Sequence, residues 1–141
     1  MTGETNLDEL IRSLSAELVE GLFVFVTIPT GRRTENLKPR MVFEEAQGTT
    51  LIMLKSEAES HSLSYEFPCR MITLNIHSSL EAVGFIARIA SELAKYDMGV
   101  NPVSGFFHDH LFVPDGREHQ AMDILQKLAR SDTIPEGHVR L

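Results

Sequence analysis

In the second half of the chain, segments with the apolar pattern of a strand alternate with segments whose apolar residues recur at helical spacing. A short apolar run over residues 71–76 has the length and composition of a strand. Over residues 83–94 the apolar positions recur at helical spacing, with charged residues on the opposite side. Apolar runs at 103–107 and 111–113 predict two further strands, and helical spacing returns over 121–128. The predicted order is β-α-β-β-α, which is most of the split β-α-β arrangement of ferredoxin-like domains.

Local signals mark the ends of these two helices. Ser78 with Glu81, and Asp115 with Glu118, have the spacing of capping boxes, in which the first side chain accepts a backbone hydrogen bond. Gly99 is expected to end the first helix, because glycine readily adopts the left-handed conformation at a helix C-terminus. Both helices are therefore expected to begin directly after a strand.

The first half of the chain is less regular. Asn6 with Glu9 is an N-cap signal, and the apolar residues that follow predict a helix as far as Gly21. These apolar residues are Leu7, Leu10, Ile11, Leu14 and Leu18. Residues 22–28 then predict a buried strand, and the polar, basic residues 29–40 predict a loop.

A hairpin and a short helix follow that loop. Two apolar runs over residues 41–54 flank Gln47 and Gly48, and glycine supplies the geometry of a tight turn. Ser56 with Glu59 again has capping-box spacing and predicts a short helix.

The two halves share a pattern of strand, turn, strand and capped helix. TTLIML before SEAE in the first half corresponds to DHLFVP before DGRE in the second. We therefore predict an α+β protein of two ferredoxin-like βαββαβ halves, each with an antiparallel sheet and helices on one face. The first half, residues 1–68, is incomplete because only a loop crosses between its strands. The second, residues 69–141, ends in a short edge strand at 137–141.

Three segments resemble the ACT domain: GFIARIASELAKYDMGVNPVS from Gly84, SSLEAVGFIARIA and GFFHDHLFVP. The similarity is to a family of small stand-alone proteins with two ACT-like halves. It implies a noncatalytic regulatory protein that binds a small molecule, in particular an amino acid, and that forms a homodimer or a higher homo-oligomer. In this family the ligand lies near the turn between the first strand and the first helix. The ligand-binding residues implied here are His77, Ser78, Ser79, Leu80, Val83, Gly84 and Asn101.

The turn also has a physical argument of its own. If Ser78 is the N-cap, the backbone N–H groups of Ser79 and Leu80 lie in the first helical turn. Free donors and the helix dipole favour a carboxylate there. The alternative is that Ser78 and Glu81 satisfy these donors themselves.

Charge and composition narrow the range of partners. The chain has 141 residues, 20 of them acidic and 13 basic, and its net charge of −7 repels nucleic acids and anionic membranes. Neither is expected as a partner. Cys69 is the only cysteine, which rules out a disulfide framework and favours a reducing compartment. The chain begins without the pattern of a signal peptide, and no run approaches the ~20 apolar residues of a membrane span. A cytoplasmic protein is expected.

A metal-dependent enzyme is the main alternative. His108 and His110 lie at alternate strand positions, so both point to one side, and imidazole is a common zinc ligand. A third ligand is needed, and it would have to come from His77, His61 or His119. The other interpretation of this segment is a hairpin turn in which Asp109 bonds to nearby backbone. We expect no catalytic residue, no metal and no cofactor, and a ligand-free interaction module is a further alternative.

The helix over residues 83–94 has apolar residues outside its main stripe. The stripe comprises Val83, Ile86, Ala87, Ala90, Leu93 and Ala94, and beside it lie Phe85, Ile89 and Tyr96. This second set fits a contact between subunits or between the two halves. Burial under the chain's own first half is the alternative.

Overall fold

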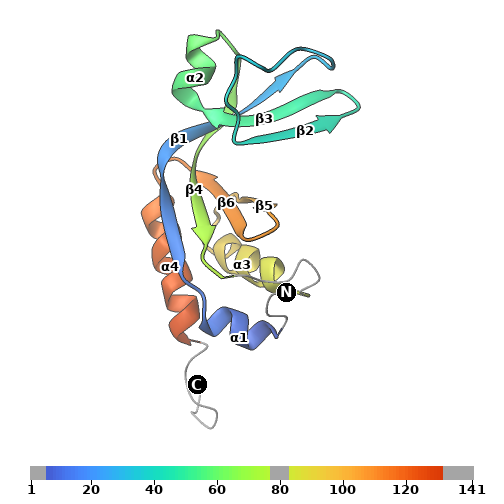
Figure 1. The fold of residues 1–141 in the computed structure, drawn as a ribbon. Helices are drawn as coiled ribbons and strands as arrows, with labels where there is room; N and C mark the ends of the chain where they lie inside the picture. The colour runs from blue at the N-terminus through green and yellow to red at the C-terminus, as the bar shows by residue number, and fades with distance from the viewer. Residues whose placement is uncertain (1–5, 77–82, 132–141) are drawn as a thin grey trace.

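The computed structural model describes residues 6–76 and 83–131 (Figure 1). In these ranges the helices are α1 Leu7–Arg12, α2 Lys55–Ser60, α3 Phe85–Ala94 and α4 Glu118–Ser131. The strands are β1 Ala16–Ile28, β2 Met41–Glu45, β3 Gly48–Leu54, β4 Glu66–Leu74, β5 Asn101–Ser104 and β6 Asp109–Pro114. The expected capping box of Ser78 and Glu81 and the expected edge strand at 137–141 lie outside the described residues.

The described strands form one antiparallel sheet in the order β2-β3-β1-β4-β6-β5. β1 and β4 lie side by side at its centre (Figure 1). Residues 16–19 of β1 pair with the C-terminal part of β4, whereas residues 23–28 pair with β3 on one side and, at Phe23 and Phe25, with the start of β4 on the other. The predicted α+β class with an antiparallel sheet is therefore confirmed.

The two halves of the fold share their central strands. The first group consists of β2, β3, β1 and β4 with α2, and the second group consists of β1, β4, β6 and β5 with α1, α3 and α4. The strand order of one group mirrors that of the other. β4 runs across the expected boundary between residues 68 and 69, and the division there stays a prediction.

Alternate residues of the strands enter different apolar clusters. On the sheet face that α3 and α4 cover, the buried strand residues are Ile72, Leu74, Leu111 and Val113. Beside α2, the first group buries Val24, Val26, Leu51 and Met53. A third cluster joins the two groups on the opposite face and contains Phe23, Ile52, Cys69, Met71 and Phe112. We call the face of the second group opposite α3 and α4 the open face.

The N-terminal helix is shorter than predicted. Asn6 caps α1 as expected, since its Oδ1 accepts a 3.0 Å hydrogen bond from the backbone N–H of Glu9. The prediction that this helix reaches Gly21 is wrong: α1 ends at Arg12 and β1 begins at Ala16. The first residues of β1 pair with β4 instead, and such long-range pairing overrides local helical spacing.

The hairpin of β2 and β3 is confirmed, but the cap of the next helix is not. β3 runs directly into α2, whose N-cap is Leu54 and has no side-chain hydrogen bond. Ser56 lies inside the helix, so its predicted capping role is wrong. β4 begins at Glu66, earlier than predicted, and β5 lies at Asn101–Ser104 instead of 103–107.

α3 packs through a stripe that overlaps the predicted one only in part. Its buried residues are Phe85, Ile89 and Leu93, of which Leu93 was predicted, whereas the predicted Ala87 and Ala94 are exposed. Larger side chains bury more apolar area, so they decide which face turns inward. Phe85 and Ile89 therefore pack in the chain's own core, whereas Tyr96, beyond the end of α3, is exposed.

In the second group the end of α3 differs from the prediction, whereas the buried face of α4 agrees with it. α3 ends at Ala94, and Asp97 rather than Gly99 adopts the left-handed conformation after it, with φ 57°. In α4 the predicted inward residues are all buried; they are Ala121, Ile124, Leu125 and Leu128.

Candidate functional site

Three of the seven predicted ligand-binding residues lie in the described part of the chain. Val83 is 84% exposed, and Gly84 is the N-cap of α3. Gly84 has φ 87°, a left-handed conformation that glycine adopts without strain. His77, Ser78, Ser79 and Leu80 lie outside the described residues.

The N-terminus of α3 offers backbone donors next to Gly84. Glycine has no side chain to cap the helix, and the first turn contains no acidic residue. Phe85 is buried in the core, which fixes the direction in which the helix starts. The N–H groups of the first turn and the helix dipole together favour an anion at this end.

Asn101 lies apart from this turn. It pairs with Phe112, which in turn pairs with Met71, and directly paired residues point to the same side of a sheet. Phe112 and Met71 belong to the cluster on the face opposite α3 and α4. Asn101 therefore faces the open face, and the structure does not bring it together with Gly84.

The histidines of the metal hypothesis lie near a hairpin end. The backbone N–H of Gly105 donates to the carbonyl of His108 at 2.8 Å and closes the loop between β5 and β6. His110 lies on the open face in β6, opposite Thr73 of β4. Among residues 6–76 and 83–131, no three His, Cys, Asp or Glu side chains form a group that could hold a metal ion. His77 is not among these residues.

The environment of His110 disfavours its protonated form. Burial is the largest cause that lowers the pKa of His110, and the nearby charges of His108 and Arg40 lower it further. Asp109 acts in the opposite direction but does not offset them. Thr73 Oγ1 lies 3.0 Å from His110 Nδ1, so the ring is held by a hydrogen bond.

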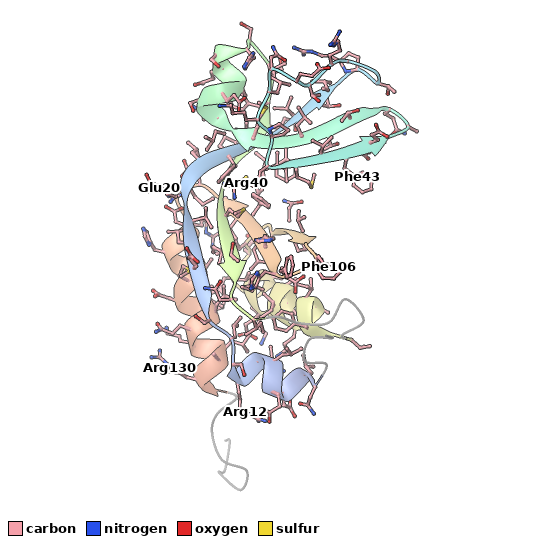
Figure 2. The ribbon with its side chains drawn as sticks, in the orientation of Figure 1. Arg12, Glu20, Arg40, Phe43, Phe106 and Arg130 are labelled. Carbon is pink, nitrogen blue, oxygen red and sulfur yellow. The ribbon has the colours of Figure 1, made fainter. Side chains whose placement is uncertain are left out.

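Arg40 is a residue that the sequence did not single out. It was expected in a solvated loop, but it lies where the two groups meet (Figure 2), with its Cζ 5.3 Å from the ring centroid of Phe23. Phe23 itself packs edge-on against Phe112, with 6.0 Å between centroids. No sequence signal links Arg40 to these rings, because the sheet register alone brings them together.

Cys69 is buried and free, as expected for a plain core residue. Burial, with a smaller contribution from Asp115, raises the pKa of its thiol to about 12. The thiolate is therefore scarce at neutral pH, and Cys69 is a poor nucleophile.

Two cavities lie elsewhere on the described surface. One, of about 280 Å³, is lined by Leu14, Ser15, Ala16, Met122, Asp123, Leu125 and Gln126. The other, of about 320 Å³, is lined by Phe25, Val26, Thr27, Thr50, Ser64, Tyr65 and Glu66. Neither includes Val83, Gly84 or Asn101. None of the described helices has the length and apolar character needed to cross a bilayer.

Family models account for nearly the whole described chain. A model described as ACT domain matches residues 2–70, and a second model with the same description matches residues 66–127. The two matches lie in tandem. A comparison with curated protein sequences finds no match.

Solved structures share the fold. VC0802 from Vibrio cholerae, described as a protein of unknown function and possible transport protein, is 35% identical with a TM-score of 0.80; the match covers 87% of this chain and 95% of that one. Atu0741 from Agrobacterium tumefaciens is 14% identical with a TM-score of 0.68, covering 82% and 89%. The regulatory subunit of aspartate kinase from Thermus flavus is 8% identical with a TM-score of 0.57, covering 91% and 99%. At such low identity the last two likenesses concern the fold alone.

Proposed function

The chain belongs to the ACT-domain family of regulatory domains, and we propose that it binds a small molecule, in particular an amino acid, without catalysing a reaction. The tandem family matches over residues 2–70 and 66–127 are the observation that carries this proposal. The likeness in fold to an aspartate kinase regulatory subunit is consistent with it. Ligand binding regulates when the ligand has different affinities for two conformations or assembly states.

We propose that the ligand binds at the turn between β4 and α3. The proposed contacts are His77, Ser78, Ser79, Leu80, Val83 and Gly84. Support comes from the left-handed Gly84 and from the backbone donors at the start of α3, which suit the carboxylate of an amino acid. Because Asn101 faces the other side of the sheet, we propose that it does not contact the same ligand.

The proposal also covers the oligomeric state of the protein and its place in the cell. ACT domains commonly pair, and we propose that this chain forms a homodimer or a higher homo-oligomer in the cytoplasm. Phe85 and Ile89 do not supply the interface, since both are buried in the chain's own core. Sedimentation velocity with and without ligand measures the assembly directly.

Thermal shift with each of the twenty amino acids tests the function. A ligand at 100 times its dissociation constant stabilises the folded state by roughly 2.7 kcal/mol. For a chain of this size that corresponds to a rise in Tm of roughly 5–10 °C. We expect one amino acid or a small chemical class to produce such a rise. A flat result for all twenty, under conditions that detect known binders, favours a ligand-free interaction module instead.

A pair of glycine variants tests the site. Gly84→Ala introduces a side chain into a left-handed position at the start of α3, so it should shift the helix start and weaken the ligand response at least about tenfold. Gly31→Ala is the matched control, because Gly31 has the same φ of 87° but lies in a loop with no atom near its Cβ position. If Gly84→Ala and Gly31→Ala keep the same thermal response to the ligand, the ligand does not bind at the turn between β4 and α3.

A further inference from the structure

We propose that residues 137–141 of this chain add a strand to the sheet, along the outer side of β1 beside residues 16–20. The sequence predicts a strand at 137–141, and this segment lies outside the described residues. Three features of the described chain support this partner for it: free backbone groups of β1, a neighbouring cavity and the charges along β1. The pairing does not depend on the ligand site proposed above.

The first residues of β1 have a strand on one side only. β4 pairs with residues 16–19, whereas β3 pairs with β1 only from Phe23 onward. Among the described residues, no strand therefore lies along the side of residues 16–22 that faces away from β4 (Figure 1). A strand with one side free is a template on which a further strand can form.

The hydrogen-bond pattern shows which backbone groups of β1 point outward. The backbone N–H of Asn75 donates to the carbonyl of Ser15 at 2.6 Å, so these residues form a hydrogen-bonded pair of the antiparallel ladder. Such pairs alternate with pairs whose N–H and C=O groups point away from the partner strand. The N–H and C=O groups of Ala16 and Leu18 therefore point away from β4 and are free to pair with another strand.

A cavity lies at the same side of β1. It has a volume of about 280 Å³ and lies between the start of β1 and α4, where Leu14, Ala16, Met122 and Leu125 form its apolar wall. This volume is several times the roughly 30 Å³ that one water molecule occupies. A strand beside β1 would turn every second side chain toward α4. The cavity therefore suits an apolar side chain of such a strand.

The sequence of residues 137–141 has the required alternation. Val139 and Leu141 are apolar, whereas His138 and Arg140 are polar and basic. When Val139 and Leu141 point toward α4, His138 and Arg140 point to the opposite face of the sheet. The segment can therefore fill the cavity and place its basic side chains on the open face.

Acidic side chains of β1 favour a basic neighbour. Val19 packs in the cluster on the open face, and Glu17, two residues before it, points to the same side of the strand. Glu17 and Glu20 are both exposed. Arg140 on the open face would lie near Glu17 and complement its charge. A second copy of β1 at this edge would instead bring the same two glutamates together, and like charges across a strand pair are destabilising.

Residues 132–136 are long enough to connect α4 to this edge. α4 runs opposite to β1 and ends at Ser131 near α1 and the start of β1 (Figure 1). The cavity-lining residues of α4, from Met122 to Gln126, lie about 8–14 Å before the end of the helix at 1.5 Å per residue. Five extended residues span at most roughly 18 Å. A segment that turns back after Ser131 runs in the direction of β1, so the two strands would be parallel.

Hydrogen exchange at the amides of Ala16 and Leu18 tests the pairing in the full chain. Free amides there would exchange almost as fast as solvent-exposed ones, whereas pairing should slow them at least about tenfold. Val139→Asp should abolish this protection, because it sets a charge against the apolar wall of the cavity. Ile134→Asp makes the same change in the connecting residues and should leave the rates unchanged. Unprotected amides in the wild-type chain, or equal rates in the two variants, would overturn the proposal.

The amides of Glu17 and Val19 are an internal reference. They belong to the hydrogen-bonded pairs with β4, so they should stay protected in Val139→Asp. An increase at these two amides as large as that at Ala16 and Leu18 would mean a general loss of stability. That result would contradict a specific pairing along the outer side of β1.

An exchange of charges tests the assigned face. Arg140→Glu should speed exchange at the Leu18 amide about twofold to fivefold, because an exposed ion pair contributes modestly. Combining Arg140→Glu with Glu17→Lys should restore the wild-type rate. A double variant that exchanges no more slowly than Arg140→Glu would contradict the contact with Glu17.

Dilution tests whether the added strand comes from the same chain. A roughly hundredfold dilution should leave exchange at Ala16 and Leu18 unchanged, because pairing within one chain does not depend on protein concentration. Protection that is lost on dilution would assign this edge to a second copy and overturn the proposal. These rates are measured without ligand, so a failure of the amino-acid proposal would not affect them.

Discussion

Glu118 is a buried carboxylate with two partners at the start of α4. Its Oε2 accepts a 3.0 Å hydrogen bond from Arg70 Nη1, and its Oε1 accepts a 2.7 Å hydrogen bond from the backbone N–H of Gly116. Burial raises the pKa of Glu118. Hydrogen bonds from the backbone N–H groups of Glu118 itself and Gly116, together with the Arg70 charge, outweigh burial, so the pKa is lowered. The carboxylate therefore ties β4 to α4 in its ionised form.

Glu118→Gln should lower the free energy of unfolding by about 2 kcal/mol at pH 7. The reason is that Arg70, whose buried Nε has no hydrogen-bond partner among the described residues, loses its counter-charge. Because the folded pKa of Glu118 lies below its unfolded value of about 4.3, the contribution is complete above that value. It is lost as pH falls through the folded pKa. Urea unfolding of both proteins from pH 7 to pH 3 measures the difference.

Glu59→Gln is the control for this prediction. Glu59 pairs with Lys55 at 3.2 Å on the exposed side of α2, where solvent screens the interaction. Its replacement should change stability little at any pH. A loss in Glu118→Gln no larger than in Glu59→Gln would mean that the Arg70 contact does not stabilise the fold.

Residue-level signals in the sequence predicted some contacts and missed others. The cap of Asn6 was predictable because a side chain three residues before a donor forms a local contact. The cap of Ser56 was not formed, because β3 extends into α2 and leaves Ser56 inside the helix. The position of Arg40 over Phe23 could not be predicted, since it depends on which strands pair.

Among the elements, β1 pairs with β4 on both sides of an irregularity and gains β3 as a second partner beyond it. Val19 pairs with Met71, but Phe23 pairs with Cys69, so β1 has two more residues than β4 across this step. Gly21 lies in the step with φ 125°. Such irregularities bend a strand and increase its twist. The bend at Gly21 lets one strand serve both groups.

Gly21→Ala should therefore be costly. An alanine Cβ would lie 3.0 Å from Leu54 Cδ2 and 3.3 Å from the ring of Phe23, in addition to the strain of the positive φ. We expect a loss of about 1–3 kcal/mol in the free energy of unfolding. Gly116→Ala is the control, because its φ is 95° and no atom lies within 4 Å of the added carbon. A similar loss in both variants would mean that backbone strain alone, and not the contact with Leu54, is responsible.

The elements themselves were largely predictable, but their ends were not. The helical spacing in α4 correctly placed its inward residues, because one face of a helix packs against a sheet. In α3 the predicted stripe correctly included Leu93, but its alanines Ala87 and Ala94 are exposed and the larger Phe85 and Ile89 turn inward. The start of β1 was not predicted, because its leucines recur at helical spacing and its pairing partner lies about sixty residues further along the chain, where Leu74 pairs with Ala16.

At the scale of the whole molecule, the shared strands should make the two groups unfold together. Residues 69–141 alone lack β1, which pairs with β4 on the inner edge of the second group. We expect this fragment to be unfolded by NMR, and mixing it with residues 1–68 to restore a dispersed spectrum. A folded, cooperatively melting fragment 69–141 would contradict the interdependence.

Tyrosine fluorescence tests the same coupling in the intact chain. The chain has two tyrosines, Tyr65 just before β4 and Tyr96 just after α3. Tyr96→Phe leaves a probe beside the first group, and Tyr65→Phe leaves one in the second. Urea transitions followed in the two variants should coincide after correction for their stabilities. Separate transitions would indicate two independent folding units.

The tandem pattern of the halves was visible in the sequence, whereas their shared strands were not. TTLIML and DHLFVP are both strands, β3 and β6, that precede a helix, as the repeat predicted. The candidate turn was placed by the resemblance to the family and includes residues outside the described ranges. The open face of the second group could not be predicted from the sequence, because its residues depend on which strands pair and in which register.

Because β1 and β4 belong to both copies of the repeat, only some rearrangements of the gene can yield a folded protein. A recombination event that moved either copy of the repeat into another protein would carry it away with one ladder unpaired along its length. Such an unprotected edge invites aggregation. Viable fusions and domain shuffling should therefore transfer both copies of the repeat as a single inherited piece.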